Sequence, residues 1–137
     1  MSERLSRFAI TLAVLAIGVA AGCRARGNLR MDGLYRVDSG DSISGYLRFY
    51  SDGTVLRVSS RGPMADVARL LKKGFAGAGA GTYKLSGSHI SFSTTSKNGT
   101  NDFDGTFDGD TLKLDWVSHI NGRSGNETYR FVPIELQ

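Results

Sequence analysis

From Gly33 to Ile134 the chain alternates short runs of apolar and polar residues, and turn-forming residues separate the runs. Their spacing of about 8 to 12 residues is typical of sandwiches and barrels. Dipeptides such as Asp52-Gly53, Asn98-Gly99 and Asn121-Gly122 favour tight hairpins, so consecutive strands should pair as an antiparallel meander. The eight predicted strands are Leu34 to Val37, Ile43 to Tyr50, Thr54 to Ser59, Gly81 to Leu85, His89 to Thr95, Asn101 to Phe107, Thr111 to Ser118 and Glu127 to Ile134.

Within these strands apolar residues recur at every second position, which places them on one face of the sheet. The polar face carries Arg48, Arg57, Asp102 and Asp104, and in the third strand Leu56 and Val58 are predicted to face inward. A sheet with one apolar face must cover that face, and closure also removes exposed strand edges. The sequence therefore predicts an all-β fold in which eight antiparallel strands close into a barrel.

One helix interrupts the strand pattern between the third and fourth strands. Pro63 suits the first helical position, and an apolar stripe at helical spacing follows it: Met64, Val67, Leu70 and Leu71. We expect this helix to lie across a mouth of the barrel. It would then serve either as a cap on the core or as a lid over a ligand entrance.

The first residues have the layout of an export signal. A basic start with Arg4 and Arg7 precedes an apolar run from Phe8 to Ala21. That run has 14 residues and is shorter than the roughly 20 that a membrane-spanning helix needs. The small residues before the single cysteine, Cys23, resemble the lipobox of bacterial lipoproteins.

This resemblance implies that residues 1–22 are a signal peptide and that Cys23 becomes an acylated, palmitate-bearing N-terminus. Residues 23–32 would form a lipidated basic tether with Arg24, Arg26 and Arg30, and residues 33–137 would form the barrel domain. Several acyl chains together anchor a protein firmly. Arg24 is not the aspartate that retains lipoproteins in the inner membrane. The resemblance therefore favours the periplasmic face of the outer membrane in a host with two membranes.

Charge adds to this picture mainly by its position. The chain carries a net charge of +4, and the first 30 residues account for all of it. From Met31 onward 12 basic residues balance 12 acidic ones, so the charge pattern gives no physical basis for binding nucleic acid.

Candidate catalytic chemistry is sparse. The two histidines, His89 and His119, fall on the outward parity and lack a cysteine partner for a metal site. The aspartates between Asp102 and Asp115 follow strand alternation and a turn rather than a calcium loop. No nucleophile elbow or buried pair of acids is indicated. We therefore expect neither an enzyme nor a cofactor or metal site.

The inward face is rich in aromatic residues, and two interpretations of it remain open. In the first, the barrel holds a small apolar ligand in the cell envelope; in the second, a filled barrel serves as an envelope structural or protein-interaction module. The candidate interior ligand-binding residues are Leu47, Phe49, Leu56, Phe92, Phe103, Phe107, Trp116 and Phe131.

The strand pattern, with Gly33-Leu-Tyr at its start and Tyr129-Arg-Phe at its end, resembles the lipocalin-like or calycin class of small barrels. The stretch from Gly45 to Ser86 is also similar to the C-terminal barrel domain of one family of F-box proteins, although the F-box helix itself is missing. Both resemblances imply a barrel, and neither implies an activity.

Overall fold

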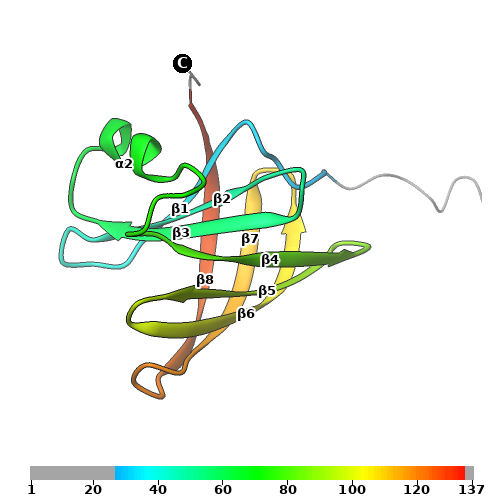
Figure 1. Ribbon diagram of the computed structural model, residues 1–137. Helices are drawn as coiled ribbons and strands as arrows, with labels where there is room; N and C mark the ends of the chain where they lie inside the picture. The colour runs from blue at the N-terminus through cyan, green and yellow to red at the C-terminus, as the bar shows by residue number, and fades with distance from the viewer. Residues whose placement is uncertain (1–26, 135–137) are drawn as a thin grey trace, which may run out of the picture.

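The computed structural model describes residues 27–134, which form a closed antiparallel barrel with strictly sequential strand order (Figure 1). The strands are β1 (Gly33–Asp38), β2 (Ser44–Phe49), β3 (Thr54–Ser60), β4 (Gly79–Ser86), β5 (His89–Ser96), β6 (Gly99–Asp108), β7 (Thr111–Ser118) and β8 (Ser124–Pro133). Pairing of β1 with β8 closes the barrel, with Tyr35 opposite Phe131. The predicted all-β barrel with one helix between the third and fourth strands is confirmed. The predicted signal peptide, Cys23, Arg24 and Arg26 lie outside the described residues.

Glycines allow the sheet to bend tightly enough to close. A Cβ atom at Gly81 would lie 1.7 Å from the Ser93 carbonyl oxygen, and one at Gly105 would lie 1.9 Å from the Lys113 carbonyl oxygen. Glycine in a strand marks such close backbone approaches and barrel corners. These positions therefore fix where β4 and β6 turn around the interior.

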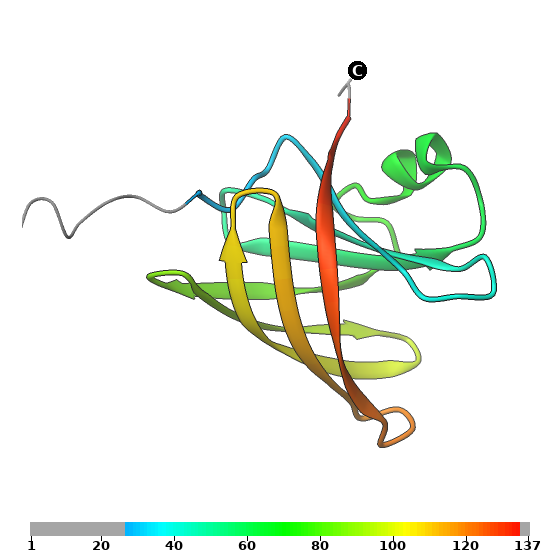
Figure 2. The same cartoon turned by 180° about the vertical axis from the view of Figure 1, so that it is seen from behind.

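The helix α2 (Met64–Leu70) packs against the outer wall of the barrel, so its predicted place across a mouth is wrong (Figures 1 and 2). Outward-facing apolar residues on three strands form the patch that it covers: Leu34, Tyr46 and Leu56. Val67 and Leu71 are buried against this patch. The helix thus has its own small hydrophobic cluster, separate from the barrel interior.

The strand β3 faces the opposite way from the prediction. Val55 pairs with Phe49, and Arg57 pairs with Leu47, so Val55 and Arg57 face the interior. Leu56 lies under α2, on the outer wall. The reason is that β3 is apolar on both faces, because one face lines the core and the other supports the helix.

Candidate ligand site at the barrel mouth

Most of the barrel interior is filled by side chains. Phe49 stands at its centre and makes edge-to-face contacts with Tyr35, Tyr83 and Phe92, with ring centroids 5.2 to 5.7 Å apart. Phe92 in turn stacks on Phe103 at 4.8 Å. Such aromatic pairs add stability beyond their buried area. These rings fill the central part of the barrel.

The structure places seven of the eight candidate interior residues in or against this core. Those buried in the core are Leu47, Phe49, Phe92, Phe103 and Phe107. Trp116 and Phe131 are half-buried and pack against it. Leu56 is the exception, because it belongs to the cluster under α2 and cannot line the interior.

The segment before β1 closes one end of the barrel. Leu29 is buried in the interior core, and the Tyr35 hydroxyl donates a hydrogen bond of 2.7 Å to the Gly109 carbonyl and accepts one of 2.9 Å from the Arg30 amide. The Arg30 guanidinium bridges Asp32 and Asp110 and lies 3.9 Å from the centroid of the Phe131 ring. Arg30 therefore serves as a clamp at the closed end, and its charge is already paired within the domain.

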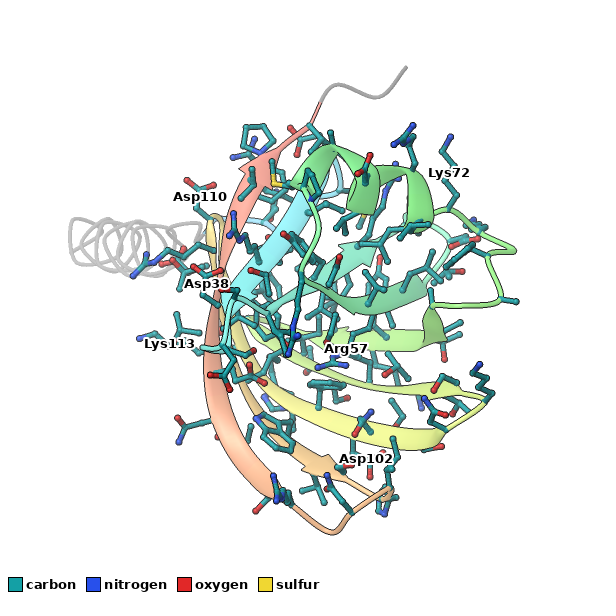
Figure 3. All side chains as sticks on the ribbon, turned by 90° about the vertical axis from the view of Figure 1, so that its left-hand side faces the viewer. Asp38, Arg57, Lys72, Asp102, Asp110 and Lys113 are labelled. Atoms are coloured by element: carbon teal, nitrogen blue, oxygen red, sulfur yellow. The ribbon has the colours of Figure 1, made fainter. Side chains whose placement is uncertain are left out.

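The opposite end is open and holds a cavity of about 650 Å³. Figure 3 views this end, where Arg57 lies on the interior side of the strands. The lining combines apolar, polar and charged residues: Val37, Asp38, Ser39, Arg57, Asn101, Phe103, Trp116, Ser118, Asn121, Gly125, Asn126, Glu127 and Thr128. Its volume is within the range of about 300 to 1,000 Å³ that is usual for small-molecule sites.

Three buried polar atoms in this part of the barrel have no hydrogen-bond partner within the described protein. Arg57 Nε and Trp116 Nε1 belong to residues that line the cavity, and the Tyr129 hydroxyl lies beside Arg57, outside the lining. The Tyr129 side chain is fully buried, and burial raises its pKa to about 12. The positive charge of Arg57 opposes this rise, although the two groups do not reach normal hydrogen-bond geometry. Leaving a buried donor unpaired costs about 1 to 3 kcal/mol, so a cluster of three is a notable departure from a well-satisfied interior.

Glu127 brings a carboxyl group to the same mouth. It pairs with Leu114 in the sheet register and therefore faces inward. Burial raises its pKa above the ordinary value, and the charge of Arg57 works in the opposite direction. The site thus contains one guanidinium and one partly desolvated carboxyl group, which form no close ion pair.

The indole of Trp116 is held by a glycine. A Cβ atom at Gly125 would lie 3.2 Å from the Trp116 ring, so the indole packs directly on the backbone of β8. Phe103 lies beside Trp116 on the neighbouring strand β6, and the Arg57 guanidinium carbon is 5.5 Å from the centroid of the Phe103 ring. The mouth therefore offers two aromatic surfaces beside its unpaired donors.

Sequence reasoning identified Phe103 and Trp116 but missed Arg57, Glu127 and Tyr129 as site residues. The missed arginine followed from the reversed parity of β3. A usable signal was present, because Val55 and Leu56 are adjacent apolar residues and leave either parity open.

The histidines lie on the surface, as predicted. His119 Nε2 is 2.6 Å from Asp102 Oδ2, and His89 Nε2 is 2.5 Å from Asp104 Oδ1; all four side chains are about half exposed or more. The hydrogen bond from Ser93 and the contact with His119 lower the pKa of Asp102. Across residues 27–134 no three histidine, cysteine or acidic residues converge as a metal site would require.

No family model, curated protein or solved structure matches this chain. Among the helical residues within 27–134, none belongs to a helix with the length and apolar content needed to cross a bilayer.

Proposed function

We propose that this protein is a lipid-anchored protein of the cell envelope whose barrel binds a small, largely apolar ligand at its open mouth. The observation that carries this proposal is that two residues lining one cavity, Arg57 and Trp116, hold buried polar groups without a partner among the described residues, and that the unpartnered hydroxyl of Tyr129 lies beside Arg57. A binding site for an apolar molecule typically combines an apolar lining with a few such polar groups.

Hydrogen-bond accounting indicates what the ligand carries. Arg57 Nε and Trp116 Nε1 can only donate, and the Tyr129 hydroxyl can also donate. A ligand that satisfies them needs an acceptor such as a carboxylate, a carbonyl or an ether oxygen. The rings of Trp116 and Phe103 would contact its apolar part.

The packed interior limits how far such a ligand can enter. Phe49 and its aromatic neighbours occupy the centre of the barrel, and Leu29 fills the closed end. The ligand would therefore sit in the mouth, above Phe103 and Tyr129, rather than along the barrel axis. This favours a compact ligand over a long acyl chain threaded through the core.

Binding can be tested with the chain from Arg24 to Gln137, which contains every strand and both hydrophobic clusters. Trp116 is the only tryptophan in the sequence, so its fluorescence reports directly on the mouth. We would add an aromatic carboxylate, naphthoate, and extract co-purifying molecules with organic solvent. Quenching or a blue shift on binding is expected.

Tyr129→Phe is the sharpest variant for this test. It removes a hydroxyl that has no partner, so the fold should be unaffected while affinity falls. Arg57→Gln should weaken binding about tenfold or more through loss of a charge-assisted hydrogen bond. Arg130→Gln, an exposed arginine on β8, is the matched control. Unchanged affinity in both mouth variants would refute the proposal.

The anchor is tested separately. Replacing Cys23 with Ser should abolish incorporation of labelled fatty acid, and continued labelling would refute the predicted lipidation. The position of the segment before β1 supports an anchor. Residues 27–32 lie at the closed end of the barrel, so an anchor attached ahead of them would not obstruct the mouth.

The alternative function, a filled barrel that binds a protein partner, has one specific observation in its favour. The interior below the mouth is packed, while Val117 and Ile120 near the mouth are 44% and 49% exposed. Where exposed apolar residues form a contiguous patch, they mark an interaction surface. Crosslinking in intact envelopes that depends on Ile120 but not on Arg57 would favour this alternative.

A further inference from the structure

A second recess lies outside the barrel, between the helix α2 and the wall beneath it. It measures about 1,130 Å³ and shares no lining residue with the mouth. Lys72, just after the helix, is labelled beside this region in Figure 3. The residues that line it are Arg48, Tyr50, Met64, Ala65, Ala68, Arg69, Lys72, Lys73, Pro133 and Ile134.

Arg48 is an unusual residue to find in such a place. Its side chain is only 8% exposed, and its Nη1 donates a hydrogen bond of 3.1 Å to the Leu71 carbonyl. Its guanidinium also lies 4.9 Å from the centroid of the Tyr50 ring, but its buried Nε has no hydrogen-bond partner in residues 27–134. A desolvated cation normally has an acidic partner. Arg48 has a carbonyl and an aromatic ring instead.

The charges around the recess do not cancel. Asp66 pairs with Arg69, and Asp52 pairs with Lys73, so two of the four cations are neutralised. Lys72 is exposed and forms no ion pair with any described residue. Arg48 and Lys72 therefore leave a net positive charge at the recess.

The remaining lining is apolar. Met64 and Ala68 come from α2, and Pro133 and Ile134 come from the end of β8. All four are at least partly exposed. A ligand that fits both halves needs a negative head for the cations and an apolar body for this surface.

We propose that this recess is a second binding site, specific for an anionic amphiphile with a phosphate or carboxylate head. The head meets the guanidinium of Arg48 and the Lys72 ammonium, and the apolar body lies along Met64, Ala68 and Ile134. This site is independent of the ligand proposed for the mouth. The same head chemistry occurs in free single-chain amphiphiles and in anionic membrane lipids.

The test uses amide proton–nitrogen correlation spectra of the chain from Arg24 to Gln137, titrated with dodecyl phosphate below its micelle concentration. Saturable shifts are expected for Ala65, Ala68, Lys72 and Ile134, while the Trp116 indole signal stays in place. Dodecyl maltoside, which has the same chain and a neutral head, is the control and should not bind. Equal binding of both compounds, or shifts confined to the mouth, would overturn the proposal.

Variants identify the cations. Lys72→Gln should weaken dodecyl phosphate binding about two- to fivefold, since it removes an exposed charge. Arg48→Gln should weaken it about tenfold or more, since the buried charge is then lost. Lys113→Gln, an exposed lysine on β7, is the matched control. Arg48 also contacts the end of α2, so if Arg48→Gln fails to fold, Lys72→Gln provides the test. If Lys72→Gln weakens binding no more than Lys113→Gln does, the proposed site is refuted.

Two further arms identify the source of the head group. Sedimentation with phosphatidylglycerol vesicles but not with phosphatidylcholine vesicles, lost in Lys72→Gln, assigns the site to membrane lipid; titration without vesicle binding assigns it to a free amphiphile. Both results support an anionic amphiphile site. If a chain that ends at Ile134 binds dodecyl phosphate more than about tenfold tighter, residues 135–137 occupy the recess themselves and the proposal fails.

Discussion

Replacing Leu29 with Ala tests whether the segment before β1 is part of the barrel core. Leu29 is 8% exposed and lies in the same cluster as Tyr35, Phe107 and Leu112. The substitution removes about three carbon groups at about 0.8 kcal/mol each and leaves a cavity. Because the site is at the end of the barrel, neighbours can partly relax, and we expect a loss of about 2 to 3 kcal/mol in the free energy of unfolding.

The assay is urea unfolding of the chain from Arg24 to Gln137, followed by Trp116 fluorescence. With a denaturant dependence of about 1 to 3 kcal/mol per molar urea, the midpoint should fall by about 0.7 to 3 M. Trp116 is at the opposite end of the barrel, so its signal reports global rather than local unfolding.

Leu85→Ala is the matched control, because Leu85 has the same side chain but is 45% exposed. Its free energy of unfolding should change by less than about 0.5 kcal/mol. If Leu29→Ala behaves like Leu85→Ala, the segment does not seal the barrel, and the account of the closed end is wrong.

Three further predictions follow from single positions in the barrel. Gly105→Ala should cost about 3 kcal/mol or more in thermal unfolding, because its Cβ would meet the Lys113 carbonyl, whereas Gly62→Ala should change stability by less than about 0.5 kcal/mol. Tyr129 is neutral in the fold with a pKa of about 12, against about 10 when unfolded. Its contribution is therefore complete below pH about 10 and is lost as the pH rises towards about 12, and urea midpoints in Tyr129→Phe should fall less over that window. The raised pKa of Glu127 means that its ionisation opposes folding, so Glu127→Gln should raise the urea midpoint at neutral pH and change it little at low pH; a lower midpoint at neutral pH would contradict this.

Sequence reasoning correctly predicted which side chains face inward in the strands that have one solvent-exposed face. In β5 to β7, Phe92, Phe103 and Leu114 alternate with exposed polar residues, so one parity satisfies the whole pattern. In β2 every residue is buried, because the barrel interior lies on one side and α2 on the other. Alternation carries no information about facing in such a strand, and the error for Leu56 and Arg57 in the adjoining β3 has the same origin.

The closed end could not be predicted for a different reason. Arg30 is paired with Asp110, which lies 80 positions away in the sequence. From the sequence alone Arg30 looked like one of three tether arginines, because nothing local distinguishes it from Arg24 and Arg26. Only closure of the barrel brings the turn between β6 and β7 to the start of β1. Leu29 and Arg30 therefore pack with the barrel, although they precede its first strand.

The plug formed by residues 27–32 also determines which way the barrel would face on a membrane. Four peptide steps separate Cys23 from Gly27, and they can span at most about 14 Å. If Cys23 is acylated as the sequence predicts, the closed end of the barrel lies close to the membrane and the mouth faces away from the lipid. A molecule that enters the mouth then arrives from the aqueous side or from a protein that faces the mouth. The bilayer to which the protein is attached cannot deliver it directly.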